Sequence, residues 1–102
     1  MVKFINTMAE LKIEVFTSPT CSHCPSAVRA TKELLEENPQ LKVGVEWVEV
    51  SMATADGRRK AANYGIHSVP TIVLTNSKGE KGGIVGAPTK KRYLDVINKM
   101  MA

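Results

Sequence analysis

The sequence predicts a small mixed α/β domain, one sheet with helices on both faces. Strand-like segments alternate with segments whose apolar residues recur every three or four positions, in the order β-α-β-α-β-β-α. The chain has 102 residues, 43% hydrophobic and 24% charged, which suits one globular domain with its own core. Strands separated by helices are expected to pair in parallel through right-handed crossovers, and the last two strands to form an antiparallel hairpin.

The first strand and helix are predicted between residues 12 and 37. Residues 12–16 alternate between polar and apolar and run into the turn residues 17–20, which include a proline. A helix follows from about Cys21 to Glu37, and Asn38-Pro39 ends it because the residue before a proline is pushed out of the helical region. On its outer face, Arg29–Glu33 and Lys32–Glu36 are spaced as i,i+4 ion pairs.

The middle of the chain predicts a strand and a second helix. Residues 42–50 are rich in valine and apolar on both parities, which is typical of a buried central strand. Residues 53–64 are expected to be helical, with Gly65 ending the helix in the left-handed conformation.

The last third predicts a hairpin and a closing helix. Strands are expected at 69–74 and 80–85, joined by a turn at 76–79. Thr89 is placed to cap a final helix. The apolar stripe of that helix comprises Tyr93, Leu94, Ile97, Met100 and Met101.

Residues 1–10 are weakly patterned and are interpreted as an N-terminal extension to a domain spanning 11–102. No apolar run approaches the ~18 residues needed to cross a bilayer, so no membrane association is expected. The N-terminus also lacks the apolar stretch of a signal peptide, which favours the cytoplasm.

The charge balance bears on partners. The chain carries 14 Lys and Arg against 10 Asp and Glu, a net charge of +4, with the basic residues concentrated after residue 57. With two Tyr, two Phe and one Trp, it has no basic surface interleaved with aromatics. A nucleic-acid partner is therefore not expected.

The motif that bears chemistry is Cys21-Ser22-His23-Cys24, at the junction between the first strand and the first helix. Its i,i+3 spacing places both sulfurs on one side of a single turn. Free N–H groups and the partial positive charge of a helix N-terminus stabilise a thiolate on Cys21. Cys24 lies further in and is suited to resolve a mixed disulfide, so the motif predicts a redox dithiol.

Two histidines bear on the interpretation of this motif. A zinc site needs four ligands, and His67 is the only candidate beyond His23, so no metal is expected. His23 lies between the cysteines, where it would stabilise the thiolate and make the disulfide more oxidising. The alternative is that His23 is a solvent-exposed turn residue with little electrostatic effect.

These residues resemble the thioredoxin family, and most closely its small, glutaredoxin-sized archaeal members. The resemblance covers about residues 11–101. It rests on four segments in order and spacing: Phe16 to Pro25 around the two cysteines, Tyr64 to Thr71 around Pro70, the Gly79-Glu80 turn, and Val85 to Thr89.

The resemblance implies a thioredoxin-like fold and an oxidoreductase that reduces disulfides in other proteins. Cys21 would attack and Cys24 would resolve. Pro70 would be cis beside the disulfide, the backbone of Val69 would pair with the substrate, and Gly86 would line the same groove. No cofactor would be needed, and a reductase of the thioredoxin-reductase type would supply electrons.

The sequence departs from larger thioredoxins at two positions. They have a tryptophan directly before the first cysteine, where this chain has Thr20, and a buried aspartate six residues before that cysteine, where this chain has Val15. Proton transfer to and from the resolving thiol must therefore differ, through water or His23.

Three other functions stay open at this point. A glutathione-dependent glutaredoxin is suggested by Gly82-Gly83, although the carboxylate expected after that pair is absent and residues 13–20 contain no Lys or Arg. A more oxidising disulfide oxidase or isomerase is suggested by His23. A binding module whose cysteines hold metal is the third.

Overall fold

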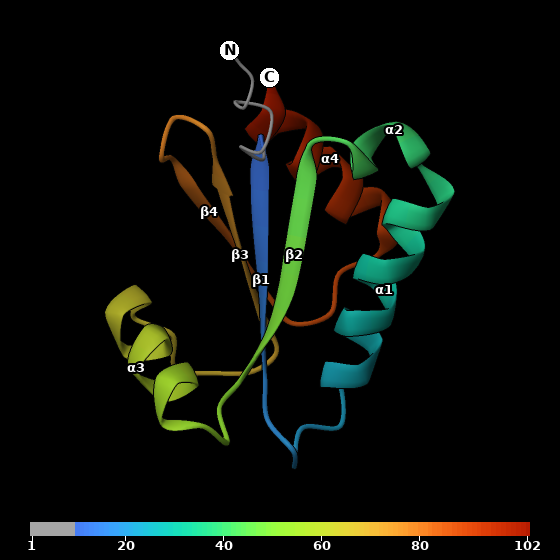
Figure 1. Cartoon of the computed structure of the whole chain (residues 1–102). Coiled ribbons are helices and arrows are strands. Elements are labelled where there is room, and N and C mark those ends of the chain that lie inside the picture. Colours follow the sequence, from blue (N-terminus) through green and yellow to red (C-terminus); the bar gives the residue numbers. More distant parts are fainter. Residues whose placement is uncertain (1–9) are drawn as a thin grey trace.

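The computed structural model describes residues 10–102 and contains one four-stranded sheet (Figure 1). Its strands are β1 (Leu11–Thr17), β2 (Val45–Ser51), β3 (Thr71–Asn76) and β4 (Lys81–Val85), in the spatial order β2-β1-β3-β4. The predicted mixed α/β class is confirmed. The extension predicted at 1–10 lies outside the described residues apart from Glu10.

Four helices accompany the sheet. They are α1 (Cys24–Glu37), the single turn α2 (Pro39–Lys42), α3 (Ala55–Tyr64) and α4 (Lys90–Met101). α1 and α4 lie on one face of the sheet and α3 on the other (Figure 1). The site that bears the cysteines therefore lies at one end of the sheet, where β1 leads into α1.

The strand pairing confirms part of the predicted topology and corrects the rest. β1 and β2 are parallel, and β3 and β4 form the expected antiparallel hairpin. β3, however, does not pair with β2 across the α3 crossover but lies antiparallel to β1. The prediction that strands separated by helices pair in parallel is therefore wrong for β3. The connection through α3 begins and ends at the same end of the sheet, so β3 starts where β2 finishes and runs in the opposite direction (Figure 1).

β2 is an edge strand, so the prediction of a buried central strand at 42–50 is wrong. Val48 is 41% exposed, and Val43, which lies before the strand, is 91% exposed. Valine favours extended backbone through its branched Cβ whether or not the residue is buried. The density of valine therefore indicated a strand correctly but not its place in the sheet.

Several element boundaries differ from the predicted ones, and prolines explain three of them. α1 begins at Cys24 because Pro25, which has no N–H, is tolerated only in the first turn. Pro39 opens the short α2, which was not predicted. β3 begins at Thr71 because Pro70 cannot donate to the sheet. Gly65 ends α3 in the left-handed conformation, as predicted, with φ of 71°.

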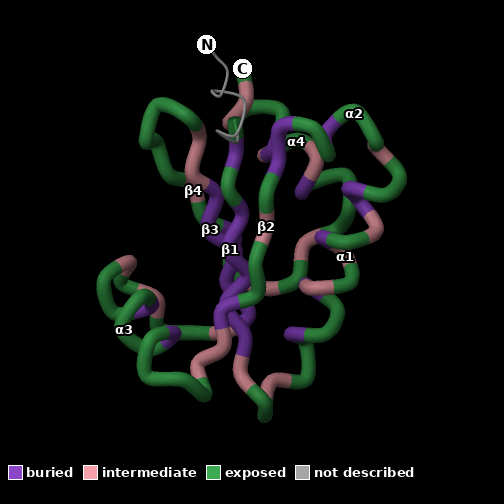
Figure 2. Tube along the Cα trace, viewed as in Figure 1, coloured by how far each residue is buried: buried purple, intermediate pink, exposed green. Residues whose placement is uncertain are grey.

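The core is larger on the α1–α4 face (Figure 2). There, β1, β3, α1 and α4 bury a continuous apolar cluster that includes Ile13, Val15, Leu34, Tyr93 and Ile97. The opposite face holds a smaller cluster of Phe16, Val50, Ala61 and Val73 beneath α3.

The ion pairs predicted on the outer face of α1 are not formed. Lys90 of α4 binds Glu33 at 3.1 Å and Glu37 at 2.8 Å. Within residues 10–102, neither Arg29 nor Lys32 has a salt-bridge partner. Glu33 and Glu37 of α1 thus bind α4, and Arg29 loses its predicted partner to Lys90.

Candidate redox site

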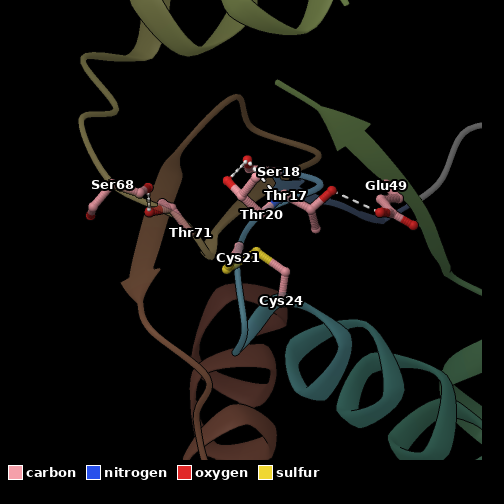
Figure 3. The surroundings of a disulfide bond; sticks show 8 residues. All are labelled: Thr17, Ser18, Thr20, Cys21, Cys24, Glu49, Ser68 and Thr71. Carbon is pink, nitrogen blue, oxygen red and sulfur yellow. Dashed lines mark hydrogen bonds between the residues drawn. A yellow bond between two sulfur atoms is a disulfide. The ribbon is translucent and has the colours of Figure 1, made fainter. Parts of the chain in front are cut away.

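The two cysteines form a disulfide at the end of β1. Cys21 and Cys24 are joined through their sulfurs, with Cα atoms 5.5 Å apart, a separation at which a disulfide forms without moving the backbone (Figure 3). Pro19 lies in the connecting turn, in which the Cys21 N–H donates to the Ser18 carbonyl at 3.1 Å. The turn and the first residue of α1 therefore hold the two sulfurs together.

The two sulfurs differ in exposure. Cys21 lies in the loop before α1 and is half-buried, whereas Cys24 is the first residue of α1 and only 3% exposed. Cys21 is therefore the more exposed cysteine of the pair.

The loop before β3 lies beside the disulfide, where Figure 3 shows Ser68 and Thr71. The Val69–Pro70 peptide bond is cis and Pro70 is buried. The Thr71 hydroxyl donates to the Ser68 carbonyl at 2.7 Å, and the Gly86 N–H donates to the Pro70 carbonyl at 2.8 Å.

Gly86 has a φ of 90°, a conformation that favours glycine, and a Cβ at this position would meet nothing within 4 Å. Its backbone conformation, rather than crowding, therefore favours glycine there. The structure thus brings the three residues assigned to substrate binding, Val69, Pro70 and Gly86, to the same end of the sheet as the cysteines.

His23 is the N-cap residue of α1 and is exposed. Its carbonyl accepts from the Ala27 N–H at 3.3 Å, but its imidazole makes no capping hydrogen bond. The residue therefore takes part in the helix start through its backbone.

A groove of about 500 Å³ runs beside the disulfide, between α1 and the ends of β1 and β2. Its charged lining residues are Arg29 and Lys32 on α1 and Glu49 on β2. The Thr17 hydroxyl donates to the Glu49 carboxylate at 2.7 Å (Figure 3).

The sequence does not indicate that these three side chains lie near the cysteines. The i,i+4 spacing predicts ion pairs within α1 for Arg29 and Lys32 instead. The i,i+3 spacing of Arg29 and Lys32 places them on one side of the helix, but nothing local indicates that this side faces the groove beside the cysteines. Glu49 depends on strand pairing across 32 residues and had no local signal.

Two further features concern metal ligands and membrane-spanning helices. Among residues 10–102, no three His, Cys, Asp or Glu side chains come together as metal ligands. No helix in the same part of the chain is long and apolar enough to cross a membrane.

A disulfide of CxxC spacing at a helix N-terminus, with a cis-proline loop beside it, is the site of a dithiol–disulfide oxidoreductase. Comparison with known proteins gives the family. A model described as the thioredoxin domain matches residues 11–98, and the chain belongs to this family.

Relatives of similar length carry the same name. The chain is 43% identical over 94 residues to a thioredoxin of Methanocaldococcus jannaschii, which covers 92% of this chain and 100% of the relative. It is 35% identical over 91 residues to a probable thioredoxin of Methanothermobacter thermautotrophicus, covering 89% and 96%. The resemblance to small archaeal thioredoxins is confirmed.

Solved structures agree on the fold. Thioredoxin O2 from Arabidopsis thaliana in its oxidised state superposes with a TM-score of 0.74 at 20% identity, covering 92% of this chain and 77% of that one. Fasciola hepatica thioredoxin gives 0.72 at 21% identity, covering 91% and 83%. The thioredoxin-like fold is confirmed, and the chain is an oxidoreductase that acts through the Cys21–Cys24 couple.

Proposed function

We propose that this protein reduces disulfides in other proteins, with Cys21 as the attacking thiolate and Cys24 as the resolving thiol. The observation that carries the assignment is the difference in exposure between the two sulfurs. Cys21 is half-buried and is the more exposed of the two, while Cys24 is 3% exposed and is bonded to Cys21.

The reaction proceeds by two exchanges. The Cys21 thiolate attacks one sulfur of the substrate disulfide; a mixed disulfide forms and the first substrate thiolate leaves, taking a proton from solvent. Cys24 then loses its proton and attacks the Cys21 sulfur, which releases the second substrate thiolate. The substrate gains two electrons and the Cys21–Cys24 pair loses two, which yields the oxidised form described above.

Val69 and Gly86 are the proposed contacts for the substrate backbone. Val69 is half-buried and precedes the start of β3, so its polar groups are not committed to the sheet ladder. An extended segment that pairs with them would bring its disulfide toward Cys21. Such strand addition provides affinity through main-chain hydrogen bonds with little dependence on side chains.

The partners proposed are protein disulfides and a reductase of the thioredoxin-reductase type. Because the reduced couple is consumed in each cycle, an electron donor must regenerate it. A reducing compartment such as the cytoplasm is the place where such a cycle runs.

Two single substitutions test the cysteine roles. Cys21→Ser should abolish reduction of a protein disulfide, because no accessible thiolate remains. Cys24→Ser should accumulate a mixed disulfide through Cys21, seen as a mass adduct that dithiothreitol removes. Ser22→Ala, which leaves both thiols in place, serves as the control. If the Cys24→Ser variant formed no adduct, or if the Cys21→Ser variant formed it instead, the assignment would be overturned.

The reduction potential tests the direction of electron flow. Thioredoxin lies near about −270 mV and protein disulfide isomerase near about −180 mV. A potential near that of thioredoxin supports the proposed reductase. A potential at or above that of protein disulfide isomerase would contradict it and favour an oxidase or isomerase. His23→Pro should make the potential more negative if the imidazole stabilises the thiolate, and an unchanged potential would remove His23 from the mechanism.

A further inference from the structure

The groove beside the disulfide carries two cations that the rest of the molecule does not use. Arg29 and Lys32 are exposed, lie one helical turn apart on α1, and have no salt-bridge partner among residues 10–102. Glu33, the i,i+4 partner predicted for Arg29, is bound by Lys90 instead, and Lys32 forms no salt bridge with Glu36. Both cations therefore remain available to a group that enters the groove.

The opposite wall carries one negative charge, which is already engaged. Glu49 accepts the Thr17 hydroxyl at 2.7 Å, and Thr17 is 4% exposed, so this contact orients the carboxylate on the β2 side. The other lining residues near the cysteines are uncharged, among them Pro19, Pro25 and Val28. The groove is thus positive along α1 and negative only at Glu49.

We propose that Arg29 and Lys32 select substrates that carry acidic side chains close to the target disulfide. The groove is lined by Cys21 and Cys24 as well as by both cations, so a segment bonded to Cys21 in the mixed disulfide passes within reach of them. A carboxylate there gains two cations at once. A lysine there meets like charge, which both lowers affinity and slows encounter. This inference rests on the proposed reduction of protein disulfides.

The test uses three peptides that share one intramolecular disulfide and differ in flanking residues, which are Glu, Gln or Lys. The measured quantity is kcat/KM for reduction by the dithiol form. We expect the order Glu, Gln, Lys, with the Glu peptide reduced about three- to tenfold faster than the Gln peptide at low salt. Turnover of the Gln peptide tests the proposed function separately, since it needs no charge recognition.

Substitution of the cations should remove the preference. In the double variant that combines Arg29→Gln with Lys32→Gln, the ratio of kcat/KM for the Glu peptide to kcat/KM for the Gln peptide should fall to near one. Lys78→Gln removes one positive charge, as Arg29→Gln and Lys32→Gln each do alone, but in the β3–β4 turn at the other end of the sheet from the disulfide, and should leave the ratio unchanged (Figure 1). A ratio near one in the parent protein, or one lost equally in the Lys78 variant, would overturn the proposal.

Two further readouts locate the effect in this groove. Raising the ionic strength from about 0.01 to 1 M should reduce the preference for the Glu peptide, because the Debye length falls from about 30 to about 3 Å. Glu49→Gln should increase the ratio, because the one negative charge that faces the cations is removed. If the ratio did not change with salt or fell in the Glu49 variant, charge at this groove would not be the basis of selection.

Discussion

The two faces of the sheet are stabilised in different ways. The α1–α4 face buries a continuous apolar cluster, in which one polar contact, between the Thr31 and Tyr93 hydroxyls at 2.7 Å, links the two helices. The α3 face has a smaller apolar cluster and a carboxylate beside it. Glu14 is 2% exposed and accepts from Lys60 Nζ and from the Tyr64 hydroxyl, each at 2.9 Å.

One strand supplies both environments. Alternate residues of β1 point to opposite faces, so Ile13 and Val15 join the large cluster and Phe16 joins the small one. Burial by itself would raise the pKa of Glu14, but the hydrogen bonds from Lys60 and Tyr64 and the charge of Lys60 outweigh it and lower that pKa. The ion pairs from Lys90 to Glu33 and Glu37 that join α4 to α1 are solvent-exposed, so the α1–α4 face is held mainly by apolar area. The α3 face is held in part by a buried carboxylate.

The largest effect is expected on the apolar face. Ile97→Ala should lower the free energy of unfolding by about 2–5 kcal/mol, because Ile97 is fully buried and the deletion leaves a cavity. Chemical denaturation measures it. The neighbouring Asn98→Ala, on the exposed side of α4, should change the value by less than about 0.5 kcal/mol. Equal effects of the two variants would mean that α4 does not hold this face.

A smaller effect with a distinct pH signature is expected on the α3 face. Glu14→Gln should destabilise by about 1–3 kcal/mol at pH 7, because hydrogen bonds to a charged group are lost. A lowered folded pKa means that the stabilisation is full above the ordinary value of 4.5 and is lost as the pH falls through the folded value. The difference between parent and variant should therefore shrink in acid. A difference that stays constant from pH 7 to pH 3 would contradict the charge-dependent role.

The smallest effect is expected at the polar contact of the apolar face. The single Thr31 hydroxyl proton is used on the Ala27 carbonyl at 2.9 Å, so Tyr93 is the donor to Thr31. Tyr93→Phe removes this donor and leaves only the Thr31 hydroxyl oxygen without it, so the free energy of unfolding should fall by about 0.5–1.5 kcal/mol.

The ionisation of Tyr93 offers a second measurement. Burial raises the pKa of Tyr93 to about 12, against a small opposing effect of the bond to Thr31. The ultraviolet titration of the parent should therefore contain a tyrosine that ionises later than the other, and Tyr93→Phe should remove that step. A titration unchanged by the substitution would contradict the burial of this hydroxyl.

Local chemistry explains which elements were predictable. Gly65, Pro25 and Thr89 mark helix ends through their own backbone or side-chain properties, and the structure has helix ends at all three. The Cys21–Cys24 spacing likewise acts within one turn, so the disulfide follows from adjacent residues.

The exposure of β2 and the burial of Glu14 were not predictable in the same way. Alternation within residues 12–16 places Glu14 on a polar face, and nothing local indicates that Lys60 and Tyr64, 46 and 50 residues away, cover it. The valines of β2 favour extended backbone in either a central or an edge strand.

By itself, the sequence determined the order of the elements apart from the single turn α2, the mixed α/β class and the redox cysteine pair, because each depends on residues within a few positions of one another. The tertiary structure decided the strand order, the partners of Glu14 and the groove that unites Arg29, Lys32 and Glu49 with the disulfide. Those features arise when segments tens of residues apart pack together. The side chain that faces each residue is then set by strand pairing and helix packing, which no local pattern encodes.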